Sequence, residues 1–502
     1  MEQLRTFRTS LRWLSPGRVA AVALLAWMLV LVPASVSGQE AGQSATTNPV
    51  KVTYLAPPDA GVTFAKDVAP LIQENCEGCH RPGSVAPMVL QNYEQVKMFA
   101  PLIRDRVSRR LMPPWPIDKT IGVKRFRNDI SLSDEEIKTI VDWVDAGAPL
   151  GDPADLPEPR VWNDDLRRWP YEDVFGRPPD VVLTSPMHTV VANGRDQWPL
   201  KITQLEDVVE SGELTEERWI MAIGARPADY DSRYVFHHAN VSLSMPGEAP
   251  NILDEGSTAL IDTAVGTDGT IFPANTGRVI RPGSEVRWNM HYHPYSENKD
   301  AALQVALWLY PKGQEPDFYT MGDVSLDAAI ASSTGGTFPA GDFKGASDPQ
   351  LSGERDILLP PNSVATMRGY HVLDRPAMVN GLRGHMHLRG KYQLVEAIYP
   401  DGRWEVINKL NWDHAWHTLF LYEEDAEPLL PTGTVILLTS VFDNTTENPH
   451  NPDPDQWVAQ GDRSIDEMSH IRLQLTYFTE EEFQKRIEER AAKAKPIASR
   501  DQ

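Results

Sequence analysis

Residues 471–477 read Ile-Arg-Leu-Gln-Leu-Thr-Tyr, an alternation of apolar and polar side chains. A period of two residues is typical of a β-strand that buries one face. Residues 305–309, Val-Ala-Leu-Trp-Leu, form an unbroken apolar run, which is also typical of a buried strand. Similar short runs alternate with turn signals such as Pro-Gly, Asp-Gly and Thr-Gly from about residue 180 to residue 478. This pattern predicts antiparallel β-sandwiches over that whole region.

The length of the β region predicts two sandwiches rather than one. Roughly 300 residues are enough for two sandwich domains. A stretch rich in glycine, serine and proline at residues 332–349 is the expected boundary between them. We therefore expect all-β, jelly-roll-like sandwiches at residues 180–330 and 331–478.

A small all-α region is expected before the sandwiches, at residues 61–150. Phe64, Val68, Leu71 and Ile72 recur at helical spacing. Ser133 and Glu136 form a capping-box pattern ahead of another apolar-periodic run, which Gly147 and Pro149 end. Residues 151–179, rich in proline and charge, are expected to link the domains, and residues 479–502 to form a charged helical tail that packs or solvates.

Charge and cysteine content exclude several classes of protein. The chain of 502 residues carries 48 Lys and Arg against 70 Asp and Glu, a net charge of −22. Nucleic acids and anionic membrane surfaces need a basic footprint, so neither is expected as the main partner. Two cysteines allow at most one disulfide, so a disulfide-stapled architecture is excluded.

The N-terminus has the pattern of a secretory signal. Four arginines precede an apolar run at residues 19–32, and small residues follow at 34–38. We expect cleavage near Gly38, a linker at residues 39–60 and a soluble periplasmic or secreted mature protein. The alternative is an uncleaved anchor, but the apolar run is shorter than the ~20 residues that a span needs.

Both cysteines lie in Cys76-Glu-Gly-Cys79-His80, the spacing of covalent c-type haem attachment. Two thiols at this spacing can add to the two haem vinyl groups, and the adjacent imidazole can reach the iron from the same turn. The alternative is a thioredoxin-like redox pair, which would need a βαβ context. The helical surroundings favour haem, and attachment outside the cytoplasm agrees with export.

The sixth haem ligand is expected to be Met112. It precedes two prolines, Pro113 and Pro114, which force an extended backbone. A thioether presented from such a loop is what class I cytochromes c use, and residues 61–150 resemble one. Met88 and Met98 are the alternatives, and Met98 is expected to be a core residue of a helix. His/Met ligation favours electron transfer over catalysis at the haem.

Thirteen histidines are present, and their grouping within the β region predicts a metal site. His385 and His387 are two residues apart, so on a strand both side chains point to one face. His237 and His238 are adjacent and can share a metal only at a bulge or strand end. His291 could complete a three-imidazole site, and spacing alone does not exclude His293.

A methionine near these histidines bears on the choice of metal. Met468 lies at the head of the last expected strand, and a thioether beside imidazoles favours copper, especially Cu(I). Zinc is the competing interpretation, in which Met468 would be only a core residue.

Residues 180–478, about three-fifths of the chain, resemble the copper type II, ascorbate-dependent monooxygenases, a family that includes the peptidylglycine α-hydroxylating and dopamine β-monooxygenases. The landmarks occur in the order of that family. They are Arg218-Trp-Ile220, Phe236-His-His-Ala239, Asn289-Met-His-Tyr292, Gly384-His-Met-His-Leu-Arg-Gly390, Phe442-Asp-Asn-Thr445 and Asp466-Glu-Met468.

The resemblance implies two copper ions, one in each sandwich. One, which supplies electrons, would be bound by His237, His238 and His291. The other, which activates O₂, would be bound by the catalytic residues His385, His387 and Met468. The family reaction inserts one oxygen atom into a substrate C–H bond and reduces the other to water.

Several positions depart from the family pattern. Ser469 stands where the animal enzymes have a disulfide cysteine, so the sandwiches must be held by packing alone. His470 and Arg472 replace the asparagine and tyrosine of the peptide-amidating branch, so a glycine-extended peptide substrate is not supported. Arg383 matches that branch's carboxylate-binding arginine. It could bind an acidic group of the substrate, or it could form a structural salt bridge within the protein.

These observations predict an exported copper monooxygenase that hydroxylates an unidentified small molecule with O₂. Electrons from an external one-electron donor would arrive through the fused haem. The alternatives are a non-catalytic copper-binding electron-transfer cytochrome and an oxidase that makes peroxide. His414 and His417 could line a substrate pocket, although core or surface positions are the preferred interpretation.

Overall fold

The computed structural model describes ten stretches of the chain, and all of them fall within one compact unit, Leu55–Gln502. The expected signal segment, the linker at 39–60 and the expected boundary at 332–349 lie outside the described residues. The described residues are 61–82, 84, 86, 88–160, 168–246, 258–264, 269–327, 329–330, 357–461 and 463–494.

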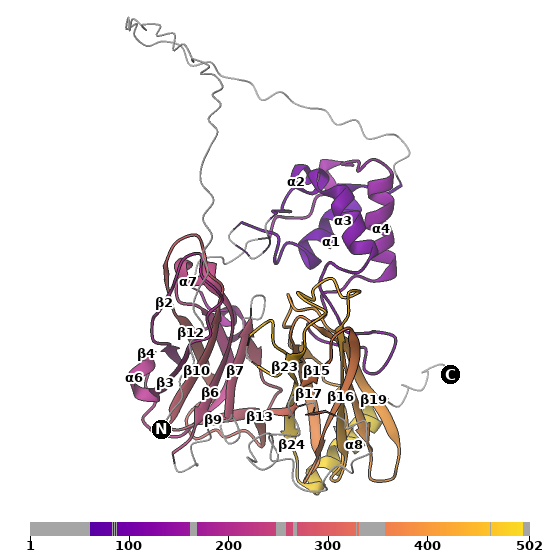
Figure 1. The fold of residues 1–502 in the computed structure, drawn as a ribbon. Helices are drawn as coiled ribbons and strands as arrows, with labels where there is room; N and C mark the ends of the chain where they lie inside the picture. Colours follow the sequence, from indigo (N-terminus) through magenta and orange to yellow (C-terminus); the bar gives the residue numbers. More distant parts are fainter. Residues whose placement is uncertain are drawn as a thin grey trace, which may run out of the picture. The chain divides into compact units, whose positions relative to one another are not determined.

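The predicted helical region is confirmed. Its elements are η1 (Phe64–Val68), α1 (Ala69–Asn75), α2 (Tyr93–Met98), α3 (Ala100–Ser108) and α4 (Asp134–Asp145) (Figure 1). Phe64, Ile72 and Trp143 are buried together in its core. The capping box of α4 is formed, since the Ser133 and Glu136 side chains each accept from the other residue's backbone N–H. Local sequence signals therefore suffice for these helices.

The segment between α3 and α4 does not share the helical core. Trp115, Ile117 and Phe126 are buried with residues of the second sandwich. The Trp115 ring meets the Phe420 ring edge-on at 4.9 Å, and Ile117 pairs with Leu410 through a β-bridge. These apolar residues lack helical spacing, so they bury their side chains against a neighbouring sheet instead.

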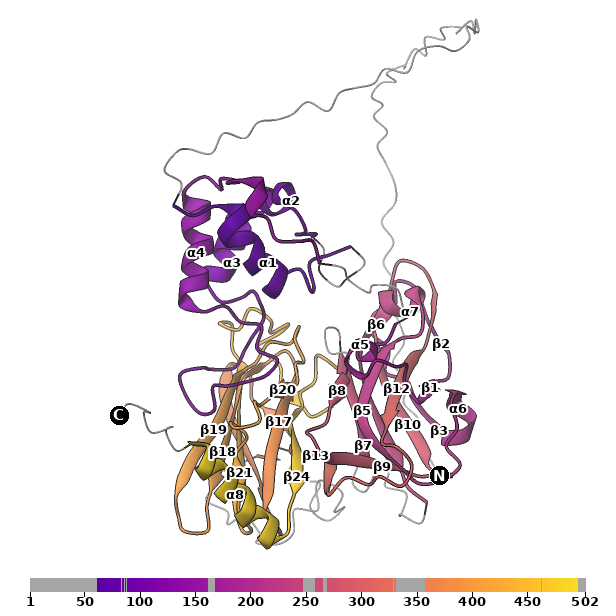
Figure 2. The ribbon, with the colours of Figure 1, turned by 180° about the vertical axis from the view of Figure 1, so that it is seen from behind.

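The first sandwich packs two sheets around one hydrophobic core (Figures 1 and 2). The predicted strand at 305–309 lies in β12, and every residue of β12 is buried. One sheet contains β1 (Val181–Thr184), β4 (Val209–Ser211), β5 (Arg218–Pro227), β8 (Gly269–Ile271), β9 (Thr276–Ile280) and β12 (Leu303–Leu309). The other contains β3 (Leu200–Gln204), β6 (Phe236–Ser244), β7 (Thr258–Ala264) and β10 (Glu285–Tyr292); a separate pair is formed by β2 (His188–Val190) and β11 (Lys299–Ala301).

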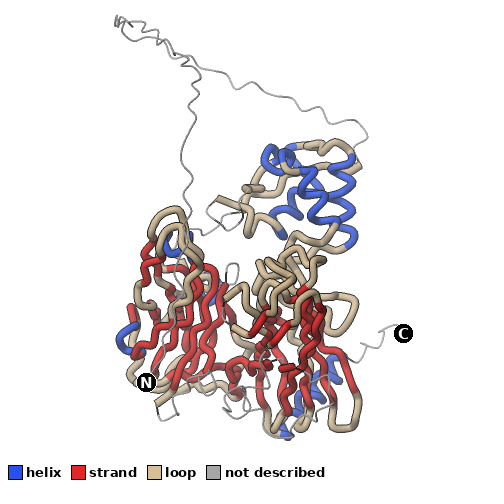
Figure 3. Tube along the Cα trace, viewed as in Figure 1, coloured by secondary structure: helices blue, strands red, loops and turns tan. Residues whose placement is uncertain are grey.

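The second sandwich has the same plan, with a core of its own. One sheet contains β13 (Phe318–Asp327), β17 (Ala377–Met386), β20 (Phe420–Leu421), β21 (Leu429–Leu430) and β24 (Ser469–Tyr477). The other contains β14 (Ala329–Ile330), β16 (Ser363–Val372), β18 (Gly390–Ile398), β19 (Trp404–Asn411) and β22 (Val435–Asn444); β15 (Leu358–Leu359) pairs with β23 (Val458–Ala459). Figure 3 shows that strands dominate both sandwiches.

One strand joins the two sandwiches. β13 pairs antiparallel with β24 and parallel with β9, so a single eleven-stranded sheet runs through both. The second sandwich therefore begins before the predicted boundary at residue 331. β24 is the strand predicted at 471–477, and Ile471, Leu473 and Leu475 are fully buried as the alternation requires. Its polar residues Gln474 and Thr476 are also buried, and Arg472 contacts Asp262 of the first sandwich.

The connecting segment contacts the helical region through Glu158 and Arg160, and the β region through its part after residue 168. Residues 151–179 include η2 (Pro153–Asp155) and α5 (Glu172–Phe175), and the Phe175 ring stacks on Trp308. The first sandwich also carries α6 (Leu205–Val208) and α7 (Tyr230–Val235). The predicted tail helix is α8 (Glu480–Ala494), anchored where Arg490 donates to the Glu427 carboxylate at 3.0 Å. Among the helices described, none has the length and apolar character needed to cross a membrane.

Candidate functional site

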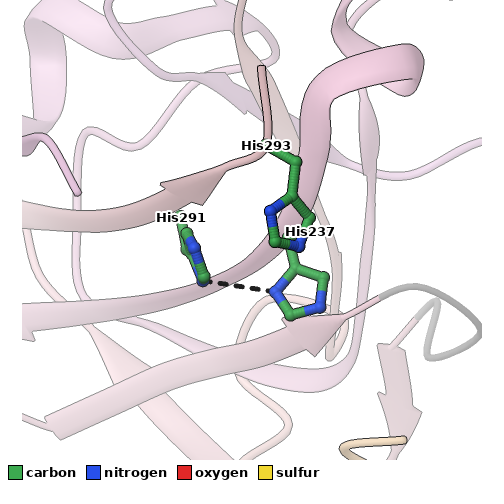
Figure 4. Close-up of side chains that lie close together, drawn as sticks. All are labelled: His237, His291 and His293. Carbon is green, nitrogen blue, oxygen red and sulfur yellow. Dashed lines mark hydrogen bonds between the residues drawn. The ribbon is translucent and has the colours of Figure 1, made fainter. Parts of the chain in front are cut away.

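Three histidines of the first sandwich form a group that could hold a metal ion. His237 lies on β6, His291 lies on β10, and His293 follows β10. One ligand atom from each lies within 4.8 Å of those of the other two. His237 Nδ1 approaches His291 Nδ1 to 3.2 Å, the contact drawn in Figure 4.

His238 belongs to the same neighbourhood. Its Nε2 lies 3.0 Å from His291 Nδ1, so His291 Nδ1 is flanked by both members of the adjacent pair. Strand pairing matches His238 with His291 and Phe236 with Tyr292, which leaves His237 as an extra residue. This bulge confirms the expectation that two adjacent histidines need an irregular strand to face one site. His293 also lies close, with its ring 4.2 Å from that of His237.

Asp196 contacts two of these rings, although no sequence pattern marks it as a site residue. His291 Nε2 lies 3.1 Å from Asp196 Oδ2, and His293 Nδ1 lies 2.8 Å from Oδ1. A carboxylate that accepts from one ring nitrogen sets the tautomer and leaves the other nitrogen free to bind a metal. Asp196 therefore leaves His291 Nδ1 available on the side of His237 and His238.

The second group lies on β17 and just after it. His385 is opposite His470 on β24, and Met386 is opposite Ser469. This pairing ends at Ser469, and Met468 directly precedes Ser469 in the chain. The His385 and His387 rings are 5.2 Å apart, and His387 Nδ1 donates to the Asp466 carbonyl at 3.2 Å, which leaves Nε2 available.

Glu467, which directly precedes Met468, bonds to the loop that carries His387. Its side chain accepts from the backbone N–H of His387 at 3.0 Å and of Arg389 at 2.6 Å. Glu467 is fully buried, and burial raises the pKa of its carboxyl to about 8 against the lowering effect of these donors. The carboxyl therefore holds the His387 loop against the strand that begins after Met468.

We expect Glu467→Ala to lower the free energy of unfolding by about 2–4 kcal/mol, because two buried N–H groups would lose their acceptor. Denaturant titration of the metal-free protein measures this. Glu467→Gln keeps one acceptor oxygen and should lose less, whereas Glu447→Ala, at an exposed position, should change little. Equal stability of Glu467→Ala and the unaltered protein would contradict the assignment.

His417 lies in the buried interior rather than on the surface, with 4% of its area exposed. Its Nδ1 is 3.3 Å from His385 Nδ1, and its ring stacks on that of His238 at 5.2 Å. His470 stacks on the opposite side of the site at 4.6 Å from His385. His414 is half-buried, with its ring 6.4 Å from that of His387. His417 thus contacts one histidine of each group.

Burial keeps these imidazoles neutral. It lowers the pKa of His237 and His470 to about 3 and of His291 and His414 to about 4. Neighbouring imidazoles add to the effect. Neutral rings present lone pairs, which metal binding requires. Two nitrogens bound at ~2.0 Å to one ion lie roughly 3 Å apart. The separations of 3.0 and 3.2 Å between His291 Nδ1 and the nearest nitrogens of His238 and His237 suit a shared ion.

The cysteine motif is compact at the end of α1. The backbone N–H groups of Cys79 and His80 both donate to the Cys76 carbonyl, at 3.1 and 2.9 Å, so one turn gathers all three residues. His80 Nδ1 donates to the Met88 carbonyl at 3.1 Å, which leaves Nε2 free for iron. Burial raises the pKa of Cys76 to about 12, unlike the low pKa of a reactive thiol pair. These residues fit covalent haem attachment.

The candidate sixth ligands differ in position. Met98 ends α2 and is 73% exposed, so the prediction that it is a core residue is wrong. Met98 is the last residue of α2, and its side chain is exposed to solvent. Met88 is half-buried against the helical core, and its carbonyl is already bonded to His80. Met112 is half-buried in the non-helical segment after α3, as its two following prolines predict.

Arg383 has a carboxylate partner within the chain. It is 7% exposed, and its Nη1 lies 3.8 Å from Asp262 Oδ2 on β7. Arg472 contacts the same carboxylate at 2.9 Å. The structure therefore shows the salt bridge, which is one of the two possibilities that the sequence left open for Arg383.

No family model and no curated protein matches the chain. Solved structures similar to it include a protein assigned as an α-L-fucosidase from Bacteroides ovatus, with 9% identity over 69% of this chain and 43% of that chain and a TM-score of 0.16. The exported protein XepA of PBSX matches with 9% identity over 52% of this chain and 86% of that one, and a TM-score of 0.14. An allantoicase matches with 9% identity over 51% and 80% of the two chains, and a TM-score of 0.15. The chain spans less than half the length of the fucosidase, and TM-scores this low carry no argument about its fold or function.

Proposed function

We propose that this chain is an exported copper-dependent monooxygenase with a fused c-type cytochrome. It would hydroxylate a C–H bond of a small organic molecule with O₂, using electrons from an external donor that enter through the haem. The observation that carries the proposal is the contact between imidazoles of the two sandwiches, whose pKa values burial lowers. Copper bound there would supply the one-electron storage and the oxygen reduction that such a reaction needs.

In this proposal the first sandwich binds one copper ion through imidazoles alone. His237, His238 and His291 are the expected ligands, and the proximity of His293 to His237 supports it as the alternative third ligand. Asp196 would orient His291, and Trp198, stacked on the His291 ring at 4.7 Å, would keep water from that side. An all-nitrogen donor set is compatible with both oxidation states of copper.

The second sandwich would bind the other copper ion through His385, His387 and Met468. Glu467 and the Asp466 carbonyl orient His387, so that Nε2 is its free nitrogen. A thioether beside two imidazoles selects Cu(I) over zinc. His417 and His470 both contact the His385 ring.

The helical region would carry one haem c, attached to Cys76 and Cys79 with His80 as axial ligand and Met112 as the sixth ligand. We expect Met112→Ala to abolish the absorption band of thioether-to-iron charge transfer and to lower the reduction potential, because the methionine ligand raises it. Spectra and redox titration of the purified protein measure both. Met98→Ala is the control and should change neither; loss of the band in Met88→Ala instead would reassign the ligand.

The function is tested with ¹⁸O₂. Metal analysis and haem staining should give two copper ions and one haem per chain, and a pool of exported metabolites incubated with reduced protein should gain one ¹⁸O atom in a product. Peroxide without labelled product would identify an oxidase. Copper and haem that exchange electrons without consuming O₂ would identify an electron-transfer protein, and either result would refute the proposal.

A further inference from the structure

A buried carboxylate of the first sandwich is held by two arginines of the second. Arg472 Nη1 lies 3.1 and 2.9 Å from the two oxygens of Asp262, and Arg383 Nη1 lies 3.8 Å from Oδ2. The exposed fractions of the three side chains are 11% for Asp262, 17% for Arg472 and 8% for Arg383. The Asn240 amide on β6 donates to the same carboxylate. Asp262 is therefore in contact with both sandwiches.

The strand registers put this ion pair beside the histidines. On β6 and β7, Asn240 is opposite Asp262, and His238 precedes Asn240 by two residues. On β17 and β24, Arg383 is opposite Arg472, two residues before His385. Residues two apart on a strand share a face and lie roughly 6–7 Å apart. The ion pair thus adjoins, on the same strand faces, the place where His238, His417 and His385 meet.

The space around the carboxylate is nearly filled. A cavity of about 20 Å³ remains, lined in part by Asp262, Arg278, Arg383 and Gln474. Such a volume has room for about one water molecule. A substrate carboxylate could reach these arginines only by displacing Asp262, and its displacement would remove the carboxylate that joins the two strand pairs.

We propose that Asp262 is a positioning and specificity-determining residue. It occupies the anion position between Arg383 and Arg472, and so holds the two histidine groups together and closes that position to acid groups of a substrate. The substrate class that follows, small molecules not selected through a carboxylate, rests on the proposed function. The occupancy of the anion position by Asp262 does not rest on it.

The test uses the full-length, metal-free protein, so that its outcome is independent of copper chemistry. Asp262→Ala deletes a group the size of formate between the two arginines. We expect formate to bind this variant and to raise its Tm in a saturable manner, with no such effect on the unaltered protein. Hydrogen exchange in β7 and β24 should be roughly tenfold faster in the variant and should be slowed again by formate.

Glu427→Gln is the matched control, because Glu427 is also a buried carboxylate paired with an arginine, Arg490, but within the second sandwich. It should neither bind formate nor change exchange in β7. If Asp262→Ala does not fold, Asp262→Asn removes the charge at nearly constant volume, and its exchange in β7 and β24 should still rise. Unchanged exchange in the folded variant, or equal formate binding by the unaltered protein, would overturn the proposal. Failure of the ¹⁸O₂ experiment would leave these outcomes unaffected.

Discussion

Met468→Ala is expected to lower the rate of ¹⁸O incorporation more than about a hundredfold while the haem content stays unchanged. Groups that only orient a metal ligand contribute roughly 10–100-fold, so loss of a ligand itself should cost more. Met468 immediately precedes β24 and follows Glu467, whose carboxyl accepts from the His387 backbone N–H at 3.0 Å. Product analysis and haem staining of the same preparation measure the two quantities.

Two further variants separate ligation from packing. Met468→Leu preserves an apolar side chain of similar volume without the sulfur, and it should lose as much activity as the alanine variant. His385→Ala should behave in the same way. Met98→Ala removes a thioether that is 73% exposed and should retain full activity. Full hydroxylation by Met468→Leu would show that the thioether is not a ligand.

The metal-free protein is expected to lose stability steeply as the pH falls from about 6.5 to about 4. Folding lowers the pKa of His237, His291, His414 and His470 to values of about 3 to 4. In this interval the unfolded chain binds more protons than the folded one, so the free energy of unfolding rises with pH and is lost on acidification. One unit of pKa corresponds to about 1.4 kcal/mol, and the cluster as a whole should contribute on the order of 5 kcal/mol.

Two buried carboxyls have the opposite effect on the pH dependence of the free energy of unfolding. Burial raises the pKa of Glu427 to about 7 and of Glu467 to about 8, so each favours the folded state at low pH and opposes it as the pH rises. The buried histidines outnumber them, and the net slope below pH 6.5 should be positive. Urea titrations between pH 7 and pH 4 measure the slope. His237→Gln combined with His291→Gln should flatten it, and a pH-independent free energy of unfolding would contradict the neutral state of the cluster.

Short-range patterns predicted much of this architecture. The period of two at residues 471–477 predicted β24, and the capping box at Ser133 and Glu136 predicted the start of α4. The adjacent pair His237 and His238 required a bulge, and β6 has one. These features depend on a residue and its near neighbours in the chain, so the sequence determines them directly.

Such local patterns could not predict contacts between strands that are far apart in the sequence. Asp196 and Asp262 carry no local mark of function, because the partners that give them a role are about 100 and 200 residues away. Trp115 and Phe126 were assigned to the helical region, although their side chains pack with Phe420 in the second sandwich. Met98 was expected inside a core because helical spacing alone does not say which face of a short helix is covered.

The sequence by itself therefore determined the strands, the helices, the cysteine–histidine motif and the pairs of histidines. Only the tertiary structure decided which imidazoles meet, that His417 contacts both His238 and His385, and that Asp262 contacts two arginines. The physical reason is that local structure depends on backbone preferences and on the period of apolar residues. A buried polar site depends instead on side chains from separate strands that packing brings together. It is stable only when every polar group in it has its hydrogen-bonding or ionic partner.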